Sequence, residues 1–299
     1  MNKKLLSVII FALVSVLLLG GCGAQKEPTT TAKQSVTATE PTTQSAEDVL
    51  KNFINPDHGS AVTLEGKIVL VSIFAGDKET SWNPAAEADH ALIEQTRENL
   101  GIATAYLTGQ AKQYGKELSF VYDWKSDKEL RYDTVFEAKL VRMDGMTYSL
   151  QNEWLLNNID TKHLLEKYKA DGIIFFFFLN TDYSNIYSPW SLGHANGDYI
   201  LLEFSNFYLK YNDMDVPPST YAHEMLHAFG AHDMYYANDY FPQEFVDDMK
   251  QSQSNDIMFT VSDGKEITNE LSALDAYYVG IGPRPAVAEK WHLAKSEHE

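Results

Sequence analysis

The sequence has little cysteine and little positive charge. Cys22 is the single cysteine among 299 residues, so the chain can form no internal disulfide and no cluster of metal-binding thiolates. Lysine and arginine number 24 against 42 aspartates and glutamates, which gives a formal net charge of −18. We therefore expect no nucleic-acid partner, because phosphates would be repelled. The net charge does not distinguish among other kinds of partner. We expect the protein to be a monomer.

Long hydrophobic stretches are scarce too, and the longest stands near the N-terminus. Lys3 and Lys4 precede an apolar run over residues 5–19, which is short for a membrane-spanning helix and is followed by glycines and Cys22. This pattern predicts a signal peptide over residues 1–21. The residues around the predicted cleavage site, Leu-Gly-Gly-Cys at 19–22, resemble the bacterial lipobox, in which the cysteine is lipidated. The alternative is an ordinary cleaved signal with an incidental cysteine.

The segment after the signal has too few apolar residues to pack. Residues 22–47 consist mostly of Thr, Ser, Gln, Pro and Ala with scattered charge, a composition typical of disordered chain. We interpret this segment as a flexible linker that begins at the lipidated Cys22. It would hold the following domain on the extracytoplasmic face of a bacterial cell membrane, with the lipid as the anchor.

Residues 48–285 alternate between apolar runs and helical patterns, which predicts one domain of the α/β (α+β) class. Strands are expected at residues 67–75, 118–122, 173–179 and 199–204. Helices are expected at residues 85–114, at 151–169 with a break near 158–160, from Pro217 onward, at 243–249 and at 269–279. We expect a hairpin at Asp144-Gly145, a loop over residues 180–198, and a loose polar tail over 286–299.

The chemistry is concentrated in residues 223–233, which read HEMLHAFGAHD. On a helix, His223 and His227 project from one face and can share a metal ion. Glu224 lies beside that metal without binding it, where it can accept a proton from water. Gly230 would end the helix, because glycine adopts the left-handed conformation that turns the chain back. This turn could bring Asp233 to the metal as a third ligand.

Two neighbours compete for the position of third ligand. His232 is the chemically commoner zinc ligand, whereas Asp233 stands three residues after Gly230. Successive residues of an extended turn point in different directions, so only one of them can face the metal. The spacing favours Asp233.

This segment resembles the metzincin zinc endopeptidases, whose pattern is HExxHxxGxx followed by His or Asp. The aspartate form is similar to the snapalysin and immune-inhibitor types of secreted bacterial protease. Residues 254–258, which end in Met258, resemble the Met-turn of that clan. The resemblance implies a mixed twisted sheet whose antiparallel edge strand is residues 199–204, packed on long helices. It also implies a boundary near residue 230, with a small lower subdomain over residues 231–285.

The resemblance also implies the activity: hydrolysis of peptide or protein substrates by water activated on one Zn²⁺ ion, with Glu224 as the general base. The substrate backbone would add as a strand along residues 199–204. Several metzincins place a tyrosine two residues after the Met-turn methionine, where this chain has Thr260. The tyrosines that could stabilise the oxyanion instead are Tyr240, Tyr277 and Tyr278.

Other readings of the metal-binding residues are less favoured. The competing function is an anchored zinc-binding lipoprotein without protease activity, but a structural metal site needs no base at Glu224. Three carboxylates could bind Ca²⁺, although acidic runs on a surface are usually just solvated. They are Asp247, Asp248 and Asp256.

The lipid anchor can be tested by replacing its cysteine. Cys22→Ser should release the protein into the medium or leave it with an uncleaved signal, because the thioether bond to lipid can no longer form. The measurement is membrane fractionation combined with the size of the product. A mature-size product that stays in the membrane fraction would show that Cys22 is not the anchor.

Overall fold

The computed structural model describes residues 60–61, 63–138, 145–181, 193–196, 199–205, 216–238 and 240–294. The predictions about the signal peptide, Cys22 and the linker lie outside these residues. Within them, no helix has the length and apolar character needed to cross a membrane.

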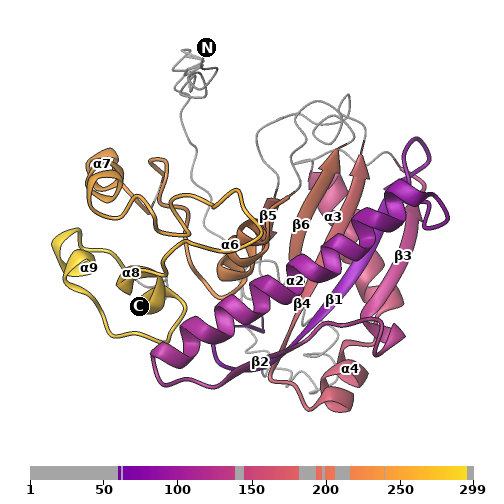
Figure 1. Cartoon of the computed structure of the whole chain (residues 1–299), viewed down its shortest axis with the longest axis horizontal. Coiled ribbons are helices and arrows are strands. Elements are labelled where there is room, and N and C mark those ends of the chain that lie inside the picture. The colour runs from indigo at the N-terminus through magenta and orange to yellow at the C-terminus, as the bar shows by residue number, and fades with distance from the viewer. Residues whose placement is uncertain are drawn as a thin grey trace, which may run out of the picture. The chain divides into compact units, whose positions relative to one another are not determined.

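A mixed, mainly parallel sheet forms the centre of the fold (Figure 1). Its middle strands are β1 (Gly66–Asp77), β4 (Gly172–Thr181) and β6 (Tyr199–Ser205). β1 and β4 pair in parallel over Ile68–Ala75, and both are almost completely buried there. Near-continuous apolar runs suit strands covered on both faces, so the strands predicted at residues 67–75 and 173–179 are confirmed.

The antiparallel edge strand is a different segment from the one predicted. β6 pairs in parallel with β4 and is covered on its other side by β5 (Gly193–Asn196), which runs antiparallel to it. The assignment of residues 199–204 to the edge was therefore wrong, as was the expectation of a loop throughout 180–198. The pattern missed β5 because this four-residue strand contains Gly, His, Ala and Asn, with no alternation of apolar and polar residues.

Two short strands share the opposite side of β1. β2 (Leu118–Val121) pairs with the first part of β1, and β3 (Arg131–Phe136) pairs with the last part, both in parallel. The 3-10 turn η1 (Lys128–Leu130) precedes β3. The predicted hairpin at Asp144-Gly145 is wrong, because Gly145 starts the helix α3 (Gly145–Asn158). β3 and β4 both run parallel to β1, so they are joined by a connection that crosses over the sheet and not by a hairpin.

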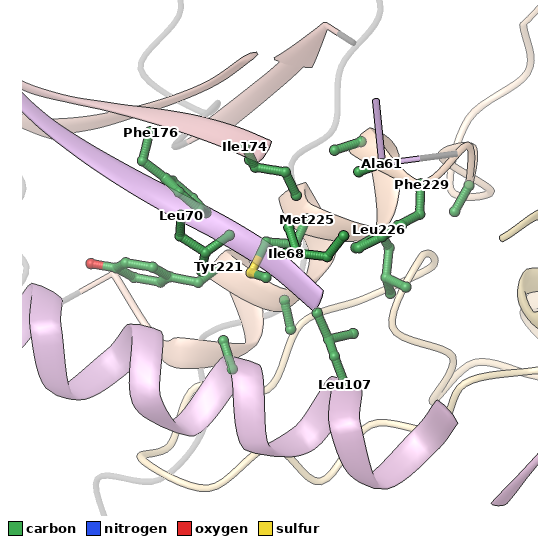
Figure 2. Packing of buried hydrophobic residues seen from close by; sticks show 14 of the residues in the cluster. Ala61, Ile68, Leu70, Leu107, Ile174, Phe176, Tyr221, Met225, Leu226 and Phe229 are labelled. Atoms are coloured by element: carbon green, nitrogen blue, oxygen red, sulfur yellow. The ribbon is translucent and has the colours of Figure 1, made fainter. Parts of the chain in front are cut away.

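Helices cover both faces of the sheet. The long α2 (Glu87–Gln113) and α6 (Pro218–Ala228) lie on one face, where Tyr221 of α6 packs on Phe176 with ring centroids 6.3 Å apart (Figure 2). Trp154 of α3 packs edge-on against Phe177 on the other face. The helix α4 (Thr161–Tyr168) follows α3 after a break at residues 159–160, as predicted. The sheet and α2 therefore fix the position of α6.

The C-terminal part contains three short helices, α7 (Gln243–Ser252), α8 (Ala273–Tyr278) and α9 (Ala286–Lys290). The start of the region predicted to be a loose tail is in fact helical and packed. Ala288 and Leu293 are buried, and Trp291 contacts Phe245 of α7 edge-on. A few apolar residues spaced among charged ones were enough to bury part of this segment, although its composition is polar.

Candidate metal centre

Helix α6 presents the two histidines as the spacing predicts. It begins with Pro217 as the N-cap and Pro218 in the first turn, where a missing N–H leaves no hydrogen bond unmade. The rings of His223 and His227 lie on the same side of α6, with centroids 4.8 Å apart. The opposite side of α6 is anchored in the core by apolar side chains such as Met225 and Leu226 (Figure 2).

A glycine turn then brings the aspartate to the histidines. Gly230 has φ 101°, in the region that side chains rarely adopt, and the N–H of Ala231 donates back to the carbonyl of Leu226 at 3.0 Å. These are the features of a helix end at glycine. The turn places Oδ1 of Asp233 3.0 Å from Nε2 of His223 and 3.1 Å from Nε2 of His227.

Backbone carbonyls fix which nitrogen of each histidine faces the aspartate. Nδ1 of His223 lies 2.8 Å from the carbonyl oxygen of Ile257, and Nδ1 of His227 lies 2.8 Å from that of Ala231. A carbonyl only accepts, so each Nδ1 must carry the proton and donate. In the neutral rings, both Nε2 atoms then point lone pairs at Oδ1 of Asp233, a buried oxygen with no hydrogen-bond donor.

This convergence of acceptors fits a metal ion. The ligand atoms of His223, His227 and Asp233 all lie within 4.8 Å of one another, and lone pairs facing one another require a cation between them. Two imidazoles and a carboxylate are a donor set that zinc takes, and carbonyl partners on Nδ1 are typical of ligating histidines. Among the described residues, these three form the group of His, Cys, Asp or Glu side chains that lie close enough together to hold a metal ion.

The electrostatics of the site favour positive charge. Burial alone would lower the pKa of His227, but the carboxylates of Asp233 and Glu224 outweigh burial and raise it to about 9. Burial would likewise raise the pKa of Asp233, yet the two histidines hold that pKa far below its ordinary range. The side chains therefore stabilise a cation at this point.

The turn at residues 256–258 contacts both segments of the site, helix α6 and the chain that follows Gly230. Ile257 supplies the carbonyl that orients His223, and the carbonyl of Met258 accepts a hydrogen bond of 3.0 Å from the N–H of Met234, which directly follows Asp233. Met258 itself is completely buried. The predicted Met-turn segment is therefore a turn that touches both ligand-bearing segments, and its equivalence to a metzincin Met-turn stays a prediction.

Glu224 lies beside the ligand group without being part of it. Its side chain is buried, with 6% of its surface exposed. Its negative charge contributes to raising the pKa values of His227 and Tyr235, which places the carboxylate close to both. The role of Glu224 as the base stays a prediction.

The side chain of His232 packs among aromatic rings. It stacks on Tyr240 with centroids 4.0 Å apart, and Tyr278 meets it edge-on at 5.0 Å. Burial first, and then the charge of His227, lower the pKa of His232 to about 4. Of the two neighbours considered for the third ligand, the structure brings Asp233 to the histidines.

The three tyrosines predicted as possible oxyanion stabilisers are spread around this region. Tyr240 and Tyr278 contact the ring of His232. The hydroxyl of Tyr277 accepts a hydrogen bond of 3.1 Å from Nη1 of Arg284. Their role in catalysis stays a prediction.

Another tyrosine, which the sequence reasoning missed, reaches the centre. The hydroxyl of Tyr235 donates to Oδ2 of Asp233 at 3.2 Å, and its ring centroid lies 6.4 Å from that of His223. Burial first, and then the charge of Asp233, raise the pKa of Tyr235 well above its usual value, so it remains a donor. A signal was present, because side chains two residues apart in extended chain point the same way.

The three carboxylates considered for calcium do not gather. Asp248 pairs with Lys290 at 2.6 Å, and Asp247 accepts from Gln243 at 3.0 Å. Asp256 is buried within the turn at residues 256–258. The structure thus gives each of these aspartates a different protein environment.

Comparisons of the chain with protein-family models, with curated proteins and with solved structures gave no match. The resemblance to metzincins therefore rests on residues 223–233 and 254–258. The function has to be argued from the geometry of the site.

Replacing each of the two neighbours, Asp233 and His232, with alanine tests which of them is the third ligand. Asp233→Ala should lose stoichiometric zinc, because the site keeps only two ligands. His232→Ala should keep zinc, with affinity reduced by at most about 10–100-fold if the ring supports the site from outside. Metal content after dialysis against a weak chelator distinguishes the variants. Zinc retained in Asp233→Ala and lost in His232→Ala would reverse the assignment.

Proposed function

We propose that this chain is a zinc-dependent endopeptidase, anchored by lipid on the extracytoplasmic face of a bacterial membrane and active as a monomer on peptides or proteins. The observation that carries the proposal is that two groups lie side by side at α6 and the turn that follows it. One is the metal-binding set of His223, His227 and Asp233, and the other is the adjacent buried carboxylate of Glu224. A structural metal site would need no carboxylate that stays off the metal.

The chain's own groups have distinct tasks in peptide hydrolysis. Zinc bound by these three residues would polarise the scissile carbonyl. It would also lower the pKa of a water molecule, so that this water can lose a proton and attack the carbonyl. Glu224 accepts the proton of the attacking water and returns it to the leaving amine. The carbonyls of Ile257 and Ala231 keep both imidazoles in the tautomer whose Nε2 is free to bind.

Tyr235 is the group best placed to assist from the protein side. Its ring is about half exposed, with 46% of its surface accessible, so the hydroxyl can turn from Asp233 toward a substrate. A protonated phenol can donate to the oxygen on which negative charge develops. In the resting arrangement the same hydroxyl orients the carboxylate of Asp233.

The route for a peptide substrate differs from the sequence prediction. β6 is already paired with β4 over Tyr199–Ser205 and with β5 over Tyr199–Leu202, so a peptide cannot add along the stretch that both partners cover. β5 ends the described sheet on that side and lies against α6. A substrate backbone that pairs with the outer edge of β5 would run beside the helix that carries the catalytic groups.

Removing the proposed base tests the activity directly. Glu224→Gln should keep zinc and the fold but lower the rate of peptide hydrolysis by about 10²–10⁴-fold, because a general base is lost and no ligand is. The measurements are zinc content, circular dichroism and cleavage of casein. Glu244→Gln, an exposed glutamate of α7, is the matched control and should cleave like the wild type.

Two results would contradict the proposal in different ways. Equal cleavage by the wild type and Glu224→Gln would show that Glu224 is not the base. A zinc-loaded wild type that cleaves no peptide would favour a zinc-binding lipoprotein without protease activity.

Removing one hydroxyl tests the role of Tyr235. Tyr235→Phe should keep zinc and lower kcat by about 10²–10³-fold with little change in KM, as expected for a donor that acts mainly in the transition state. Tyr236→Phe, on the neighbouring exposed ring, is the control. Loss of zinc affinity at unchanged kcat in the zinc-saturated enzyme would instead restrict Tyr235 to orienting Asp233.

A further inference from the structure

Two buried aspartates lie close to each other, one in the turn that supports the metal centre and one in α8. Asp256 lies at the start of this turn and is 2% exposed, and Asp275 of α8 has no exposed surface. Asp256 forms a β-bridge with Glu270, two residues before the Ser272 that Asp275 caps, so the two carboxyl groups lie close together. Two ionised carboxylates cannot share such a site, because like charges in contact within the protein interior repel strongly.

The hydrogen bonds account for one oxygen of each carboxyl group. Oδ1 of Asp256 accepts from the N–H of Met258 at 2.6 Å, and Oδ2 of Asp275 accepts from the N–H of Ser272 at 3.3 Å. The remaining oxygens, Oδ2 of Asp256 and Oδ1 of Asp275, are buried and find no donor. A proton on one carboxyl group supplies the missing donor.

We propose that Asp256 and Asp275 form a proton-sharing pair that positions the metal-binding residues. The pair joins α8 to the turn at residues 256–258, since Asp275 also closes the capping box of α8 with Ser272. The same turn orients His223 through the carbonyl of Ile257 and holds the segment after Asp233 through that of Met258. Asp256 and Asp275 are positioning residues, and they act through the turn.

The electrostatic surroundings agree with a retained proton. Burial first, and then the charge of Asp256, raise the pKa of Asp275 well above its ordinary value, and burial also raises the pKa of Asp256. Helix α2 packs against the pair with two tyrosines whose pKa values the charge of Asp275 helps to raise. The titratable groups around the pair are Tyr106 and Tyr114 of α2, Tyr278 of α8, and Glu270.

The expected pH dependence follows from the retained proton. An aspartate whose pKa is higher in the folded state stabilises the fold fully below its unfolded pKa, and this contribution is lost as the pH rises toward the folded pKa. An asparagine in place of one aspartate supplies the donor permanently and carries no proton to lose. The stability of Asp275→Asn relative to the wild type should therefore increase with pH.

The first test compares melting temperatures of the full chain, purified and kept free of metal by a chelator, between pH 4.5 and 6.5. Relative to Asp275→Asn, the wild type should lose roughly 3–5 °C per pH unit. The metal-binding residues are the same in both proteins, so the difference between the proteins is the readout. Asp248→Asn, at an exposed ion pair whose carboxyl pKa is lowered, is the control and should show no such trend.

The second test measures zinc affinity at pH 7.5. Asp275→Ala should bind zinc about 10–100-fold more weakly, as is typical when support outside the ligands is lost, whereas Asp275→Asn should bind like the wild type. Rescue by asparagine distinguishes a shared proton from a need for charge. The inference concerns the metal centre and does not depend on peptide hydrolysis, so an inactive but zinc-binding protein leaves it standing.

Several outcomes would overturn the proposal. Parallel melting profiles of the wild type and Asp275→Asn would show that no raised carboxyl pKa exists. Zinc affinity as weak in Asp275→Asn as in Asp275→Ala would show that the negative charge is needed. If Asp275→Asn does not fold, Asp256→Asn gives the same test from the other side, and failure of both to fold would rule out a neutral donor in this place.

Discussion

Hydrogen-bond acceptors brought together without a donor need a positive charge, and this constraint governs the C-terminal half of the structure. At the metal centre, Nε2 of His223, Nε2 of His227 and Oδ1 of Asp233 converge while carbonyl groups hold the protons on the far side of each ring. Below it, two carboxyl groups meet in a fully buried position. A divalent metal ion suits the first place and a proton the second, because each supplies the charge that its surroundings lack.

The sheet and its helices provide the rigidity that such a site requires. Aromatic side chains of β4 point alternately to the two faces, so Phe176 anchors α6 through Tyr221 while Phe177 anchors α3 through Trp154. Two of the candidate ligands therefore stand on a helix fixed by the main core. The third, Asp233, precedes Met234, whose N–H bonds to a turn that pairs with Glu270 shortly before α8. A site supported from two directions can hold the geometry that a metal ion would require.

Much of the centre could be predicted from the sequence because its determinants are local. The spacing of His223 and His227, the helix end at Gly230 and the approach of Asp233 all follow from helical geometry and the conformational freedom of glycine. The strands at residues 67–75 and 173–179 were equally clear, since apolar runs of this length are typical of strands buried on both faces.

The features that the sequence did not predict depend on partners distant in the chain. The edge position of β5 and the parallel pairing of β3 are set by neighbours far along the chain, and no periodicity in such short strands reports them. The contact between Asp256 and Asp275 was hidden for the same reason, because it exists only once α8 packs against the turn.

The three ligands come from a stretch of only eleven residues, 223–233, whereas the carbonyl that orients His223 lies 34 residues further along the chain. Closing the short loop costs little chain entropy, while docking the distant turn costs more and requires the C-terminal helices. The centre can therefore assemble in two successive steps during folding. Once α6 and its glycine turn have formed, the ligands can already meet, and the later arrival of the turn at Ile257 locks the imidazole in place. In kinetic terms, a weak metal site would precede a tight one during folding, and the ion captured early would favour the chain conformations that complete its own enclosure.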